Sequence, residues 1–127
     1  MSDLPFFPAE EYEMRLRNVR RSMAERDLDA CLVATPVNIY YLAGVSHWGY
    51  FAQHILIVPR EGEMVVIARA MEQVTMDLQL TSARFVGYGD LDDPAIATCE
   101  VLREAGLAEG RLGIEKKSLF LPVGTAE

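Results

Sequence analysis

The sequence has few cysteines, no long apolar run and no excess of positive charge. Its two cysteines, Cys31 and Cys99, cannot build a disulfide-rich scaffold, and no Cys-x-x-Cys pair is present for zinc or redox chemistry. No apolar run approaches the roughly 20 residues needed to cross a bilayer. The first residues also lack the basic and then apolar pattern of a signal peptide. We therefore expect a cytoplasmic protein with no membrane partner.

The net charge of the chain is −7, from 12 basic and 19 acidic residues. A nucleic-acid-binding protein needs a basic surface to displace counterions from phosphates, so we expect no nucleic-acid partner. The basic residues that do cluster alternate with acids: Arg15, Arg17, Arg20 and Arg21 with Glu11, Glu13 and Glu25. Glu11 and Arg15 have the favourable i,i+4 spacing of a helix. We interpret this cluster as a solvated helix face.

Apolar spacing and turn residues predict one domain in which helices and strands alternate. Tyr12, Leu16, Val19 and Met23 lie on one stripe of the first predicted helix. In chain order we predict a helix over 10–26, a strand over 30–34, a short helix over 37–43, strands over 54–58 and 64–68, a helix over 71–80, a strand over 84–88, a helix over 94–105 and a strand over 112–115.

The strongest local signal is a hairpin over 54–68, whose two apolar arms flank the turn sequence Pro-Arg-Glu-Gly. Asp93 followed by Pro94 predicts a helix start, and Met71, Val74 and Leu78 have helical spacing. Because helices separate most of the strands, we expect parallel pairing for much of the sheet, with the hairpin antiparallel. The fold class is therefore α/β, with a mixed central sheet and flanking helices.

The residue types that usually form metal, nucleophile or phosphate sites do not have the required spacing in this sequence. His47 and His54 are seven positions apart, which suits neither a helix pair nor a strand pair of metal ligands. Asp90, Asp92 and Asp93 are better explained as a loop and a helix cap. No Gly-x-Ser-x-Gly sequence is present, and no glycine-rich turn follows the first strand to bind phosphates. We predict no catalytic residue and no metal site in this chain.

An aromatic segment over 46–53 is the one stretch that could meet a ligand. It contains His47, Trp48, Tyr50, Phe51 and Gln53. Aromatic rings fill cores more often than they bind ligands, but rings interleaved with glycine ahead of a strand also suit a displayed loop. Both interpretations stay open from these residues alone.

The segment 35–44, Thr-Pro-Val-Asn-Ile-Tyr-Tyr-Leu-Ala-Gly, resembles the signature of the creatinase/prolidase N-terminal domain. An arginine-rich first helix, the hairpin turn over 59–62 and the final Leu-Gly-Ile-Glu strand follow the order of that family. The resemblance implies a creatinase/prolidase N-terminal domain-like fold with a ribonuclease H-like motif. It also implies three regions: a tail over 1–9, the domain over 10–120, and the start of a linker to a C-terminal catalytic domain over 121–127.

Family membership would make this chain the non-catalytic N-terminal domain of a metallohydrolase, an Xaa-Pro dipeptidase or aminopeptidase. In such enzymes the C-terminal domain holds a pair of divalent metal ions, Mn, Co or Zn, between two Asp, one His and two Glu. We therefore expect no cofactor in this chain. The resemblance implies two partners, namely the catalytic domain of the same chain and a second subunit of a homodimer.

In family dimers the N-terminal domain helps to cover the neighbouring active site. The resemblance thus makes His47, Trp48, Tyr50, Phe51 and Gln53 candidates for contacting substrate in trans. Creatinases tend to carry an arginine near Gln53 that can grip a carboxylate, and its absence here speaks against creatine as the substrate. Two alternatives remain: a creatinase-like or other small-zwitterion hydrolase or lyase, and a stand-alone binding module.

Overall fold

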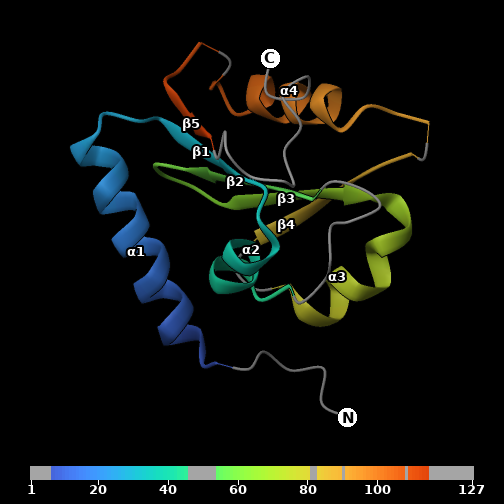
Figure 1. Ribbon diagram of the computed structural model, residues 1–127, viewed down its shortest axis with the longest axis horizontal. Coiled ribbons are helices and arrows are strands. Elements are labelled where there is room, and N and C mark those ends of the chain that lie inside the picture. Colours follow the sequence, from blue (N-terminus) through green and yellow to red (C-terminus); the bar gives the residue numbers. More distant parts are fainter. Residues whose placement is uncertain (1–6, 46–53, 81–82, 90, 108, 115–127) are drawn as a thin grey trace.

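The computed structural model describes residues 7–45, 54–80, 83–89, 91–107 and 109–114 of the 127-residue chain, and these form an α/β fold. The elements are α1 (Ala9–Glu25), β1 (Ala30–Val33), α2 (Pro36–Ala43), β2 (Ile55–Pro59), β3 (Met64–Arg69), the 3-10 turn η1 (Ala70–Glu72), α3 (Gln73–Gln79), β4 (Ala83–Tyr88), α4 (Pro94–Glu104) and β5 (Leu112–Ile114). The predicted order of helices and strands is confirmed. Figure 1 shows α4 on one side of the sheet and the other three helices on the opposite side.

The five strands form one mixed sheet in the order β4-β3-β2-β1-β5. Two pairings are parallel, β1 with β5 and β3 with β4, and the predicted β2–β3 hairpin is antiparallel. The β1–β2 pair is also antiparallel, although α2 separates these strands and the sequence favoured a parallel pair. Val33 at the end of β1 pairs with Leu56 near the start of β2, so the connection through α2 stays at one end of the sheet and makes no crossover.

The central hairpin is buried on both faces. Successive side chains of a strand point to opposite faces, so each face of the hairpin receives alternate residues. Leu56, Val58 and Val66 pack with residues of α1, α2 and α3 in one core cluster. Ile57 and Ile67 pack with residues of α4 in the other. This arrangement explains why both arms of the hairpin are continuously apolar rather than alternating.

The predicted ends of α2 and α4 are confirmed. Gly44 caps α2 in the left-handed region at a φ of 81°, and its N–H donates to the Tyr40 carbonyl at 2.9 Å. At the start of α4, the Asp93 side chain accepts a hydrogen bond from the Ala95 N–H at 2.9 Å, and Pro94 occupies the first helical position.

The interpretation of the arginine cluster as a solvated face is wrong for two of its four members. Arg15 is only 8% exposed, and it donates to the Tyr41 carbonyl at 2.9 Å and to the Glu11 carboxylate at 3.0 Å. Arg20 donates to the Pro59 carbonyl at 3.0 Å and also to the Gly62 carbonyl. The last carbonyls of a helix and those of a turn lack regular hydrogen-bond partners. The long arginine side chains of α1 reach such carbonyls in α2 and in the hairpin turn.

The helical spacing of Met71, Val74 and Leu78 correctly predicted α3, but these residues lie on its exposed side. They are 66%, 69% and 47% exposed, respectively. The buried residue of the helix is Met76, which joins the core cluster beneath α1 and α2. Periodicity therefore identified the helix but not the face that packs on the sheet.

We predict that Gly87→Ala lowers the free energy of unfolding by about 1–3 kcal/mol, the usual range for overpacking. A Cβ at Gly87 would lie 2.9 Å from the Ala70 Cα, so the backbones of β4 and η1 would have to separate. The control is Gly113→Ala, whose Cβ would meet only the side-chain ends of Leu28 and Cys31. Urea denaturation measures both variants, and equal stabilities would contradict the prediction.

Candidate functional site

The five residues predicted to contact substrate lie outside the described residues: His47, Trp48, Tyr50, Phe51 and Gln53. Their role therefore stays a prediction. The described residues on either side of the segment are both in the interior, since Val45 and His54 are buried. The core thus holds the points from which the segment leaves α2 and enters β2.

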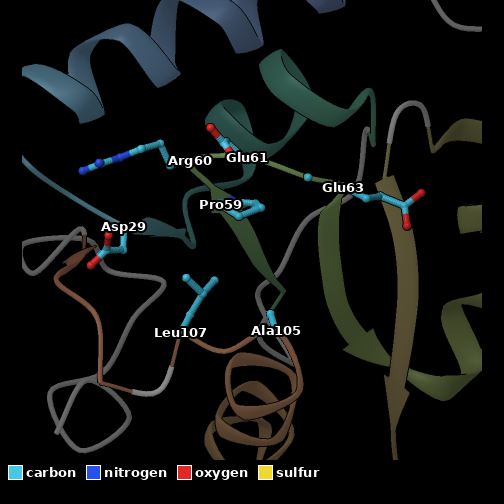
Figure 2. A pocket seen from close by; sticks show the side chains of 8 residues that line it. Asp29, Pro59, Arg60, Glu61, Glu63, Ala105 and Leu107 are labelled. Atoms are coloured by element: carbon cyan, nitrogen blue, oxygen red, sulfur yellow. The ribbon is translucent and has the colours of Figure 1, made fainter.

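A pocket of about 480 Å³ lies beside the β2–β3 turn (Figure 2). It is lined from three directions, by the start of β1, by the turn itself and by the region after α4. The lining residues are Asp29, Pro59, Arg60, Glu61, Gly62, Glu63, Ala105 and Leu107. Figure 2 shows the side chains of Arg60 and Glu63 pointing in opposite directions.

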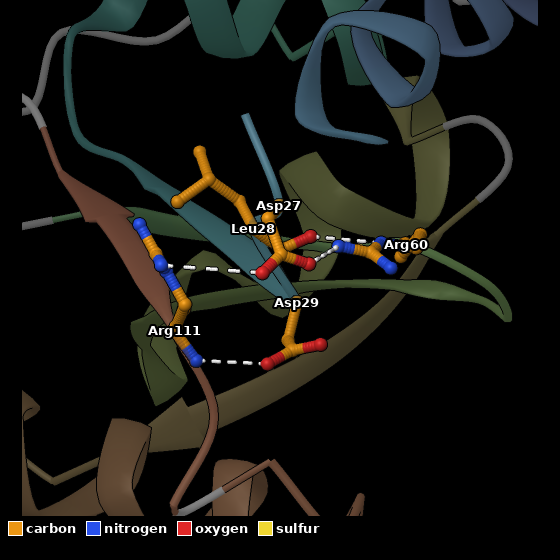
Figure 3. Close-up of polar contacts among 5 residues, drawn as sticks. All are labelled: Asp27, Leu28, Asp29, Arg60 and Arg111. Carbon is orange, nitrogen blue, oxygen red and sulfur yellow. Dashed lines mark hydrogen bonds and ion pairs between the residues drawn. The ribbon is translucent and has the colours of Figure 1, made fainter. Parts of the chain in front are cut away.

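The charges nearest this pocket hold three segments together (Figure 3). The Asp29 carboxylate accepts a hydrogen bond from the Arg111 N–H at 2.8 Å, which ties the residue before β1 to the residue before β5. Arg60 donates from Nε to the Leu28 carbonyl at 2.9 Å. The Asp27 carboxylate lies between two guanidinium groups, 3.4 Å from that of Arg60 and 3.9 Å from that of Arg111. The two exposed ion pairs of Asp27 are each worth about 1 kcal/mol or less.

Among the described residues, no group of three His, Cys, Asp or Glu side chains could hold a metal ion. Two of the acids after β4 instead accept hydrogen bonds from backbone N–H groups, in line with the interpretation of this region as a loop and a helix cap. Asp92 accepts a hydrogen bond from the Gly89 N–H at 3.0 Å, and Asp93 caps α4. Asp90, the third acid of that group, is outside the described residues.

An aromatic cage around Arg15 is the feature that sequence reasoning missed. The guanidinium carbon of Arg15 lies 4.4 Å from the ring centre of Phe7 and 4.3 Å from that of Tyr41. The ring of Tyr12 is slightly farther away, at 5.4 Å. Cation–π contacts of this kind favour a guanidinium that has left water. Tyr12 and Arg15 are three residues apart on one helix, but only the tertiary structure brings Tyr41 of α2 to the same place.

The cage holds α1 against α2, and its base is a buried phenol. The Tyr12 hydroxyl is buried and has no hydrogen-bond partner among the described residues. Burial, with the nearby Tyr40 contributing, raises the pKa of Tyr12. The ring of Tyr12 therefore stabilises the contact by packing, while its hydroxyl opposes it. Because α2 ends at Ala43, this contact also sets where the chain leaves toward the aromatic segment.

The two cysteines differ in environment, and both are free. Cys31 is half-buried and packs against the core cluster under α1, where burial raises the pKa of its thiol. A raised pKa lowers the fraction of Cys31 in the thiolate form, which is the reactive form. Cys99 is exposed on α4.

Within the described part of the chain, no helix is long and apolar enough to cross a bilayer.

A family model described as "Creatinase/Prolidase N-terminal domain" matches residues 15–127 of this chain. Among curated proteins, the chain is similar to the ectoine hydrolase of Halomonas elongata, with 35% identity over 66 residues. That match covers 52% of this chain but 16% of the relative. The chain thus spans a small part of this curated relative.

Two solved structures have the same fold. A dipeptidase from Pyrococcus horikoshii is 26% identical with a TM-score of 0.69, and the match covers 83% of this chain and 29% of that one. The N-terminal domain of an Xaa-Pro dipeptidase from Lactobacillus brevis is 19% identical with a TM-score of 0.76, and the match covers 88% of this chain and 82% of that one. The fold of this chain is therefore one that has been solved both within a longer chain and as a separate domain.

We predict that Tyr12→Phe raises the free energy of unfolding at neutral pH by about 1 kcal/mol, since it removes a buried hydroxyl without a partner. The pKa of Tyr12 is raised in the folded state, so folding favours the protonated phenol. The stability that this preference gives is complete below the ordinary pKa of 10.0 and is lost as the pH rises above that value. Wild type should therefore lose more stability than the variant above pH 10.0.

Chemical denaturation at neutral and alkaline pH measures this difference. Tyr41→Phe is the matched control, because it keeps the ring on Arg15 and its side chain is partly exposed. The control should match wild type at neutral pH. A loss of stability in Tyr12→Phe at neutral pH would contradict the prediction and indicate that the hydroxyl has a partner.

Proposed function

Because this chain belongs to the creatinase/prolidase N-terminal domain family, we propose that it is the non-catalytic N-terminal domain of a metal-dependent hydrolase. The proposed parent enzyme is an Xaa-Pro dipeptidase or aminopeptidase. In that enzyme the domain contributes to dimerisation and helps to cover the active site. The observation that carries the proposal is the family match over residues 15–127, on a chain that spans 29% of a solved dipeptidase.

The chemistry of the described residues is consistent with a domain that binds and shields. Their charged groups cap helices and tie strands, as Asp93 and Asp29 do, and do not converge on a reacting atom. The described residues also supply no ligand set for a metal ion. They therefore do not fit the divalent metal pair of the proposed parent, whether Mn, Co or Zn. The proposal assigns that pair to a C-terminal catalytic domain.

Within the proposal, the contribution of this chain to the active site comes from the aromatic segment over 46–53. Its flanks, Val45 and His54, are buried, and Arg15 holds the preceding helix in place. Anchored flanks would let a short segment present its side chains at a defined position over a neighbouring active site. The candidates for contacting substrate in trans remain His47, Trp48, Tyr50, Phe51 and Gln53.

A second candidate is a hydrolase that acts on a small zwitterionic molecule. The 35% identity to an ectoine hydrolase over 66 residues favours this candidate. The lack of an arginine near Gln53 speaks against creatine itself as the substrate. Both candidates share the domain arrangement and differ in substrate. A stand-alone binding module is the remaining alternative, and calorimetry with proline dipeptides and zwitterions on this chain alone would detect it.

The parent gene and its product test the proposal. We expect the reading frame to continue after Glu127 into a domain with two Asp, one His and two Glu as metal ligands. The purified product, supplied in turn with Mn²⁺, Co²⁺ and Zn²⁺, should hydrolyse Xaa-Pro dipeptides and be a dimer by light scattering. Hydrolysis of ectoine alone would favour the second candidate. A reading frame that stops at Glu127 would overturn both.

We predict that Trp48→Ala and Phe51→Ala lower the activity of the full-length enzyme while its melting temperature stays nearly unchanged. The reason is that a ring contacting substrate is not needed for packing. The comparison is Phe85→Ala, which removes a ring that packs against the core and should therefore lower the melting temperature. A loss of about 3–5 kcal/mol of stability, typical of a core aromatic, would instead show that Trp48 and Phe51 are packing residues.

A further inference from the structure

An apolar stripe on η1 and α3 has no cover within the described residues. It consists of Met71, Val74 and Leu78, and we call it the α3 stripe. These positions follow one another along one side of a helix, at spacings of three and four. A hydrogen bond between Gln73 and Asp77, at 2.8 Å and exposed, lies beside the stripe. An apolar centre with a polar border is the usual composition of a contact surface.

Packing on the other side of the helix keeps the α3 stripe turned outward. Met76 is buried in the core, and Leu80 packs against the same cluster. Ala70 of η1 meets β4 at Gly87 so closely that a Cβ there would lie 2.9 Å from the Ala70 Cα. The helix therefore cannot rotate to bury its stripe without losing both contacts. The apolar spacing of these residues predicts a buried face, yet the face is exposed. Disagreements of this kind between sequence and burial concentrate at functional surfaces.

The small size of the stripe decides between its possible occupants. A stable interface between free proteins buries about 800 Å² on each partner, and three side chains fall well short of that. Two separate copies of this chain would therefore not be held together by the α3 stripe alone. A covalently connected partner has a high effective concentration, so a small patch is enough to dock it. The chain spans only 29% of the similar dipeptidase, which leaves most of such a polypeptide to provide that partner.

We propose that the α3 stripe docks onto an apolar patch of the catalytic part of the same polypeptide. This inference rests on the proposed function, because it needs a catalytic part to be present. It adds the surface of this domain through which the two parts are held in a fixed orientation. Met71, Val74 and Leu78 are buried in that interface, and the Gln73–Asp77 pair lies at its rim.

The test is Val74→Glu in the full-length polypeptide, because glutamate keeps helix propensity but cannot be buried without a partner. Hydrogen exchange of the α3 amides should become about tenfold faster or more, since burial of a valine is worth about that factor. The matched control is Ile96→Glu, at an apolar position of α4 that is 60% exposed on the other side of the sheet. The control should leave the α3 exchange unchanged.

The same substitution in the 127-residue chain completes the test. There the stripe has nothing to dock on, so Val74→Glu should leave the melting temperature of the chain unchanged. Unchanged α3 exchange in full-length Val74→Glu would overturn the inference, and Xaa-Pro hydrolysis by that protein would show that the proposed function still stands. Dimers of the 127-residue chain that Val74→Glu abolishes would also overturn it, in favour of a second copy as the occupant.

Discussion

The burial of the β2–β3 hairpin on both of its faces is the constraint on which the rest of this structure depends. Each strand sends alternate side chains to opposite sides, so the hairpin needs cover above and below. Leu56 and Val66 require the layer of α1, α2 and α3, whereas Ile57 and Ile67 require α4. Each fully buried aliphatic side chain contributes about 1.5–3 kcal/mol, so no single polar contact in the domain matches their sum. The remaining elements are arranged to supply that cover.

Arginines then fix how the cover is oriented. Arg15 donates to the end of α2, Arg20 to the hairpin turn, and Arg60 to the segment just before β1. In each case a charged donor meets a backbone carbonyl, and hydrogen bonds of this kind are stronger than those between neutral groups. The chain is acidic overall, yet three of its 12 basic residues donate to carbonyls that helix ends, turns and loops leave without regular partners. In the arginine-rich helix, Arg15 and Arg20 are therefore accounted for by contacts within the domain.

The polar residues of the domain also bear on its function. Asp92 and Asp29 accept hydrogen bonds from backbone N–H groups, His54 is buried, and Cys31 is half-buried against the core. The role that we propose for the domain is one of contact and position, through the active site that it covers and the catalytic part on which it docks. Met71, Val74 and Leu78 are exposed apolar residues that the sheet does not need for its cover.

Features that depend on neighbours in sequence could be predicted from the sequence. The end of α2 at Gly44, the Asp93 cap of α4 and the hairpin turn over 59–62 all follow from local backbone preferences and short-range hydrogen bonds. The candidate contact residues over 46–53 came from a family resemblance rather than from physics, and the structure does not describe them. Only the tertiary structure decided three other features: the antiparallel β1–β2 pair, the burial of Arg15 beneath Tyr41, and the outward side of α3. Each of these depends on segments far apart in sequence, and periodicity along one helix or strand carries no information about what lies across from it.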